Sequence, residues 1–191
     1  SILAIPKDIV KSPTSLMLVT RNGTVKKMSS ESFKDVRRSG IIAIRLDKGD
    51  QLASALLTNK GDEVMLATTG GQSIRFKEGD IREMGRTAGG VRGIKLGKGD
   101  EVVGVDVVKK ENKTGSFLTM SANGFGKKTA LKEYKVQKRG GSGIKTAKVT
   151  QKTGKLIVAK VLEGGEEELI AMSKKGQVLR TALKDISSFG R

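Results

Sequence analysis

The sequence predicts an all-β protein, a propeller-like disc in which four-stranded blades are repeated along the chain. Two observations support this prediction. The 191 residues include 25 glycines and only 2 prolines, and 36% of them are hydrophobic, which suits many short strands and turns better than a helical bundle. The chain also repeats itself about every 50 residues, and four strands in a repeat of that length are typical of a propeller blade.

Four glycines mark equivalent points in the repeats. They are Gly23, Gly71, Gly124 and Gly176, which lie 48, 53 and 52 residues apart. An apolar segment precedes each of these anchor glycines, and a second segment returns after it. The pairs Asn22-Gly23 and Asn123-Gly124 are typical of two-residue hairpin turns. We therefore expect the first strands of the repeats at residues 16–20, 64–68, 117–121 and 169–173, each followed by a returning strand.

Two further positions recur after each anchor glycine. A basic residue stands four positions on, in the order Lys27, Arg75, Lys128 and Arg180. A large apolar or aromatic residue stands ten positions on, in the order Phe33, Ile81, Tyr134 and Ile186. Because its equivalents are apolar, Tyr134 is interpreted as a buried plug, and not as the nucleophile that the only tyrosine of a DNA-binding protein could suggest.

The second half of each repeat predicts two more strands. Third strands are expected at residues 41–46, 91–96 and 144–149, and fourth strands at 52–57, 102–108 and 156–162. A unit with one apolar face needs neighbours to cover it, so the repeats should stack. We predict one domain over residues 1–191, with repeats at about 1–57, 58–108, 109–162 and 163–191. The first and last repeats are expected to be incomplete parts of a larger ring, with residues 2–5 completing a blade.

The composition argues against most catalytic and metal chemistry. The chain contains no histidine and no cysteine, which excludes disulfides, the usual zinc sites and histidine-dependent catalysis. Acidic residues such as Asp47, Asp50 and Asp100 fall in hairpin turns, where Asp is favoured for turn geometry. The glycine-rich stretch 85–93 lacks the Gly-Lys-Ser/Thr ending of a nucleotide-binding loop. We therefore expect no catalytic residue, no metal site and no cofactor in this domain.

The charge of the chain predicts an anionic partner. The formal net charge is +17, and no apolar run is long enough to suggest a membrane segment. The same loop of successive repeats is basic, so a ring would align these charges along one edge and match them to phosphates. Aromatic content is only 3%, so we predict duplex DNA bound through its backbone; a basic edge that docks an acidic protein is the alternative. The candidate DNA-binding residues are Arg37, Arg38, Arg82, Arg86, Arg92, Lys135, Gln137, Lys138, Arg139, Lys145 and Arg191.

Several segments resemble the C-terminal domains of the DNA gyrase A family. They are residues 22–27, 74–78, 84–96, 123–129 and 186–191, in the family's order and spacing. The resemblance implies a β-pinwheel that wraps DNA around its basic perimeter, so that the complete enzyme, a type IIA topoisomerase, introduces negative supercoils in an ATP-dependent reaction. The resemblance also implies that the partners are the rest of gyrase A and gyrase B, which form a heterotetramer. This heterotetramer would be found in the bacterial cytoplasm, in association with the nucleoid. ATP and magnesium would bind elsewhere in that holoenzyme.

Residues 137–143 resemble the signature box of this family. The match departs at Ser142, where the box normally has a basic residue, and the stretch follows two complete repeats although the box normally belongs to the first blade. We interpret it as an echo of the box and as one DNA contact among several. The equivalent domain of topoisomerase IV therefore stays open as an alternative identification.

Overall fold

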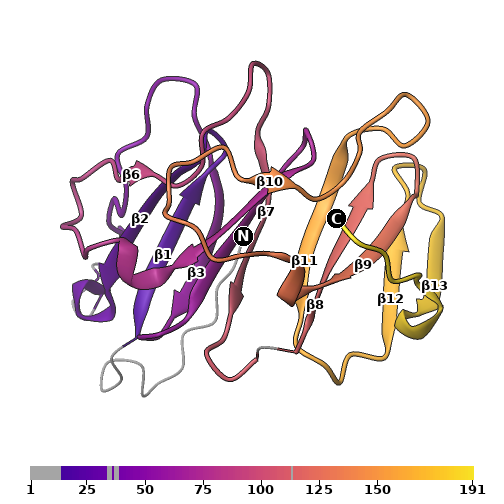
Figure 1. The fold of residues 1–191 in the computed structure, drawn as a ribbon. Helices are drawn as coiled ribbons and strands as arrows, with labels where there is room; N and C mark the ends of the chain where they lie inside the picture. Colours follow the sequence, from indigo (N-terminus) through magenta and orange to yellow (C-terminus); the bar gives the residue numbers. More distant parts are fainter. Residues whose placement is uncertain (1–13, 34–35, 37–38, 113) are drawn as a thin grey trace.

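The computed structural model describes residues 14–33, 36, 39–112 and 114–191. The strand expected at residues 2–5 lies outside this part. Within it the regular structure consists of β-strands and short 3-10 helices, which confirms the all-β prediction. The strands form sheets that stand side by side, from the first sheet at the left of Figure 1 to the last at its right.

The sheets follow one another along the chain. The first has the strand order β3-β1-β2-β6 and consists of β1 (Ser15–Thr20), β2 (Thr24–Ser29), β3 (Leu52–Thr58) and β6 (Val91–Arg92). The second has the order β10-β5-β4-β7 and consists of β4 (Glu63–Thr68), β5 (Gln72–Lys77), β7 (Val102–Val108) and β10 (Ile144–Lys145). The third, β11-β8-β9, and the fourth, β12-β13, consist of β8 (Ser116–Ser121), β9 (Gly126–Ala130), β11 (Leu156–Leu162), β12 (Glu168–Met172) and β13 (Val178–Ala182).

The third strands were predicted too long. Residues 41–46 form no strand, and β6 and β10 contain two residues each, paired with β2 and β5 of the preceding repeat. The ladder between β2 and β6 stops at Arg92 because β2 begins at Thr24, directly after the anchor glycine Gly23. Beyond β6, the N–H groups of Gly93 and Ile94 both donate to the carbonyl oxygen of Gly23, which has a φ of 81°. Ile94 is nevertheless buried. The apolar residues at positions 93–96 therefore reflect burial of this segment and not pairing with another strand.

Strand β4 explains the continuous apolar character of the first strand in each repeat. Val64 and Leu66 pack into a core shared with the first sheet, whereas Met65 and Ala67 pack into a core shared with the third. A strand between two sheets is buried on both faces, so it does not alternate between apolar and polar residues. The second blade is therefore stabilised by its neighbours on both sides.

The order of strands gives every sheet an inner and an outer edge. The fourth strands β3, β7 and β11 pack beside one another, and a Cβ atom built on Gly104 would lie 2.5 Å from Cβ of Ala159. These strands therefore form the inner edge of the disc, where only glycine allows β7 and β11 to approach so closely. Strands β6 and β10 lie at the opposite edge of their sheets, which is the outer edge.

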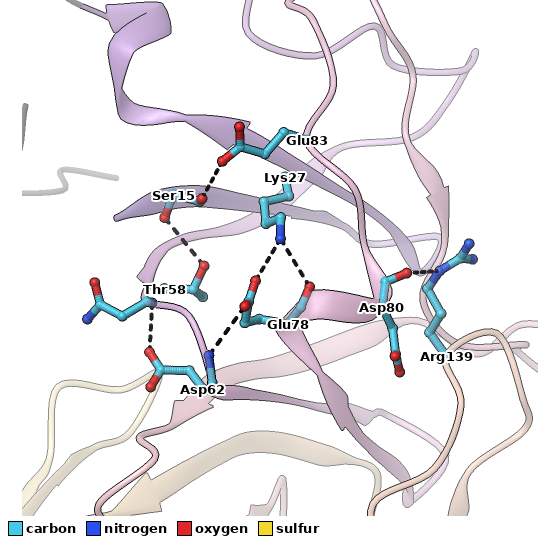
Figure 2. A network of polar contacts seen from close by, with 10 residues as sticks. Ser15, Lys27, Thr58, Asp62, Glu78, Asp80, Glu83 and Arg139 are labelled. Atoms are coloured by element: carbon cyan, nitrogen blue, oxygen red, sulfur yellow. Dashed lines mark hydrogen bonds and ion pairs between the residues drawn. The ribbon is translucent and has the colours of Figure 1, made fainter. Parts of the chain in front are cut away.

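A recurring basic residue links each blade to the next. The side chain of Lys27 donates to the carbonyl oxygen of Glu78, Arg75 donates to that of Leu131, and Lys128 donates to that of Leu183. In each case the acceptor is the first residue of a 3-10 helix in the next repeat, namely η3 (Glu78–Asp80), η4 (Leu131–Glu133) or η5 (Leu183–Asp185). Lys27 also bonds the carboxylate of Glu78 at 2.7 Å (Figure 2). We call these bonds the blade ties.

The plug position follows directly after each 3-10 helix. Ile81 and Tyr134 are 1% and 2% exposed, and the Tyr134 ring packs edge-on against Phe117 with 5.4 Å between the ring centroids. The Tyr134 hydroxyl is hydrogen-bonded to the hydroxyl of Thr146, and burial raises the pKa of this phenol. The prediction of a buried plug is confirmed, because this hydroxyl is both enclosed and bonded within the protein.

The first blade tie offers a stability test. Replacing Lys27 by methionine leaves the buried Glu78 carboxylate without its cation, so we expect the free energy of unfolding to fall by about 3–5 kcal/mol. Urea denaturation measures this loss. Arg180→Met is the control: Arg180 stands at the same position in the last repeat, but it pairs with Glu168 of its own hairpin, and both side chains are exposed, 69% and 44% accessible. It should cost less than about 1 kcal/mol. Equal losses in the two variants would contradict a structural role for the tie.

Candidate nucleic-acid interface

The basic loops run along the outer edge of the disc. Each begins after a plug, and its backbone bonds to the returning strand of the preceding blade: the N–H groups of Met84, Gln137 and Phe189 donate to the carbonyl oxygens of Lys27, Arg75 and Lys128. The loops at residues 81–93 and 134–145 also bond each other, because the Gly140 N–H donates to the carbonyl oxygen of Gly93, with 2.6 Å between nitrogen and oxygen. We call residues 81–93, 134–145 and 186–191 the outer band.

The outer band carries most of the predicted DNA-binding side chains, and these are exposed. Within the described part of the chain, their charged groups form no hydrogen bond or ion pair, so their charges are available to a ligand. They are Arg82, Arg86, Arg92, Lys135, Lys138, Lys145 and Arg191. Arg37 and Arg38 lie outside the described residues, and their DNA contacts stay predictions.

Two of the predicted DNA-binding residues, Arg139 and Gln137, also make hydrogen bonds within the protein. The guanidinium of Arg139 is half-buried and donates through Nε to the carbonyl oxygen of Asp80 at 3.1 Å (Figure 2) and through Nη1 to that of Arg92 at 3.0 Å. Its remaining N–H groups can still reach a phosphate, so Arg139 can both link two loops and bind. Gln137 is half-buried, and its backbone N–H donates a hydrogen bond to the carbonyl oxygen of Arg75.

A buried lysine holds the loop at residues 81–93 in place. Lys26 is 0% exposed, and its ammonium group donates to the carbonyl oxygens of Ala43, Arg86 and Ala88 at 2.6, 2.7 and 2.9 Å. Burial lowers the pKa of this ammonium group. Sequence analysis missed Lys26, although its position, three residues after the anchor glycine, also carries Lys127. The Lys127 side chain bonds the carbonyl oxygen of Gly190 in the next basic loop.

The acidic residues Asp50 and Asp100 of the turns before the fourth strands bond a neighbouring hairpin turn of the same blade. Asp100 Oδ1 accepts hydrogen bonds from the backbone N–H of Gly70 at 2.7 Å and the hydroxyl of Thr69 at 2.8 Å. Asp50 Oδ1 accepts from the N–H of Asn22 at 3.0 Å. No cluster of three acidic residues that could hold a metal ion occurs in the described part, which also contains no helix suited to crossing a membrane.

Known proteins similar to this chain share its repeats. The family model for the DNA gyrase C-terminal domain, a β-propeller, matches residues 14–59, 62–109, 115–163 and 167–191. The DNA gyrase A protein of Staphylococcus epidermidis is 37% identical over 185 residues, which make up 97% of this chain and 20% of that protein. The chain thus spans about a fifth of the length of this relative.

Two solved structures resemble the fold. A DNA gyrase A C-terminal domain superposes with a TM-score of 0.82 and 30% identity, over 94% of this chain and 59% of that one. The C-terminal domain of a DNA topoisomerase IV superposes with a TM-score of 0.88 and 26% identity, over 100% of this chain and 60% of that one. Both similarities extend over nearly all of the disc described above.

The role of Lys26 can be tested by hydrogen exchange. In Lys26→Met the carbonyl oxygens of Arg86 and Ala88 lose a charged donor, so we expect the amides of residues 84–92 to exchange at least about tenfold faster. The free energy of unfolding should fall by about 2–4 kcal/mol: the three charged hydrogen bonds contribute about 1.5–3 kcal/mol each, but methionine also removes the desolvation cost of the buried ammonium group. The exposed Lys60 provides a control, as Lys60→Met should change neither quantity. Unchanged exchange in Lys26→Met would show that the loop is held by other contacts.

Proposed function

The chain belongs to the DNA gyrase C-terminal domain family, and on that premise we propose that it binds duplex DNA along the outer band and bends it around the disc. The bend would let a DNA gyrase holoenzyme introduce negative supercoils in an ATP-dependent reaction. The domain itself would supply binding and geometry but no catalytic group. The proposed partners are duplex DNA, the rest of gyrase A, and gyrase B, in the bacterial cytoplasm.

The free cations of the outer band are the observation that supports this proposal best. They come from the same loop of successive repeats, and their side chains have no internal partner in the described structure. Duplex DNA carries one negative charge per about 1.7 Å of its axis, so a row of fixed cations can neutralise several phosphates and release their counterions. Arginine is well suited here, because its planar guanidinium can bond a phosphate through two N–H groups at once.

The arrangement favours backbone binding over sequence reading. The described outer band contains no α-helix that could enter a major groove, and base recognition needs side chains at the base edges. Bending a site of 20–30 base pairs by 40–90° costs about 1–6 kcal/mol, which several phosphate contacts can offset. A disc of packed blades that keeps its shape would therefore impose its curvature on the DNA.

Two alternatives have specific observations in their favour. The topoisomerase IV domain superposes with the higher TM-score, so the equivalent domain of topoisomerase IV is the alternative identification. We prefer gyrase because the sequence is 37% identical to a DNA gyrase A protein. The net charge of +17 would also suit an acidic protein docked at the same edge.

Salt dependence tests backbone binding. If the outer band neutralises about 6–10 phosphates, affinity for duplex DNA should fall by about a thousandfold or more between 50 and 200 mM salt. Arg86→Ala, Arg92→Ala and Lys138→Ala should each weaken binding to all duplex sequences alike and lower the salt slope by about 1. Fluorescence anisotropy on unrelated duplexes measures both effects. A loss confined to one sequence, or a flat salt response, would count against this function.

DNA topology separates wrapping from docking. A closed circular plasmid relaxed by a type I topoisomerase in the presence of the protein should keep a shifted linking number after the protein is removed, because a wrapped turn stores writhe. The triple variant with Arg86, Arg92 and Lys138 replaced by alanine is the control and should leave a smaller shift. If the unaltered protein binds the plasmid without any shift, it binds DNA but does not wrap it.

A further inference from the structure

A basic hollow opens between the second and third blades, beside the outer band. It has a volume of about 760 Å³ and lies at the end of the sheets where β4 turns into β5. Its walls come from that hairpin turn, from the turn at residues 97–100, from Ser142 and Gly143 of the outer band just before β10, and from Lys155 just before β11. The hollow therefore reaches from the outer edge towards the inner edge of the disc.

The charges lining the hollow are mostly uncompensated. Lys95, Lys98 and Lys155 are exposed, and no hydrogen bond or ion pair engages their ammonium groups within the described residues. Asp100 is the acidic residue of the lining, and its Oδ1 already accepts three hydrogen bonds, from Thr69, Gly70 and Glu101. Three like charges around one concavity repel each other and concentrate a positive potential there. A bound anion would reduce this repulsion.

The equivalent junction between the first and second blades has an ion pair where the hollow has a free cation. The residue before the fourth strand there is Glu101, and its carboxylate lies 3.9 Å from the guanidinium of Arg21. At the junction with the hollow the two corresponding residues are Lys155 and Thr69. The backbone is matched at both junctions, because Val102 N–H donates to Arg21 and Leu156 N–H to Thr69. A carboxylate in the first junction is thus replaced by a free ammonium group in the second.

We propose that this hollow is a phosphate-binding site, and that its phosphate comes from the backbone of the duplex held on the outer band. This assignment rests on the proposed function, and it extends the DNA contact from the outer edge onto one face of the disc. The volume exceeds what a single phosphate needs and suits a phosphate together with its sugar, since small-molecule sites commonly measure about 300–1,000 Å³. Lys98 and Lys155 come from different repeats, so one bound phosphate would bridge two blades.

Two double variants of equal charge test the site. Lys98→Gln with Lys155→Gln should weaken duplex binding about tenfold at about 100 mM salt and lower the salt slope by about 0.9, the value for one phosphate. Lys60→Gln with Lys110→Gln removes the same charge from exposed turns at the opposite end of the strands, and should change affinity less than about twofold. Lys155→Glu, which copies the residue at the first junction, should weaken binding further. Thermal unfolding confirms that the variants stay folded.

Tripolyphosphate, titrated by calorimetry, distinguishes the two sources of phosphate. Equal duplex affinity in the two double variants would overturn the DNA assignment. If tripolyphosphate then binds the unaltered protein but not the Lys98→Gln, Lys155→Gln variant, the hollow is a site for a free polyanion. If it binds both proteins equally or neither, no phosphate site exists there. A failure of the unaltered protein to bind duplex in a salt-dependent way would instead overturn the proposed function, while calorimetry still decides the hollow.

Discussion

The blade tie is the interaction on which the position of the outer loops depends. A cation on the returning strand of one repeat bonds the first carbonyl oxygen of the 3-10 helix in the next, as Arg75 does with Leu131. The plug follows this helix, and three residues later the chain bonds back to the backbone of the same cationic residue, as Gln137 does with Arg75. Helix, plug and loop are therefore placed by the blade before them.

This arrangement separates the positive charges into two populations. Lys26 and Lys27 are buried and bonded to protein oxygens, so they hold structure together at the cost of desolvation. Arg86 and Lys138 are exposed, and their loops are held through backbone atoms. Because the anchoring contacts use main-chain groups, the exposed side chains stay free for a polyanion. The net charge of +17 thus includes buried cations that stabilise the fold and exposed cations that the proposed function assigns to DNA.

Much of this could be read from the sequence, and the failures have a common cause. The first, second and fourth strands follow from apolar runs and turn glycines that lie within one repeat, as in Leu156–Leu162. The predicted bounds of the third strands were wrong because the partner strand lies in the preceding repeat and does not extend past its anchor glycine. Lys26 was missed for the same reason, since two of its three acceptors, Arg86 and Ala88, lie about 60 residues away. Contacts between repeats leave only a faint periodic signal.

The order of the loops in the free protein would have an energetic consequence for the proposed DNA wrapping. Ordering a flexible loop on binding costs free energy for each residue that becomes fixed, which reduces the net affinity. In this disc the Gly140–Gly93 bond, the two carbonyl bonds of Arg139 and the Lys26 ammonium group order the loops in the free protein. Under the proposed function, the attraction of the free cations for phosphates would then be available to bend the duplex. Rigid loops, and not the net charge alone, would convert binding into wrapping.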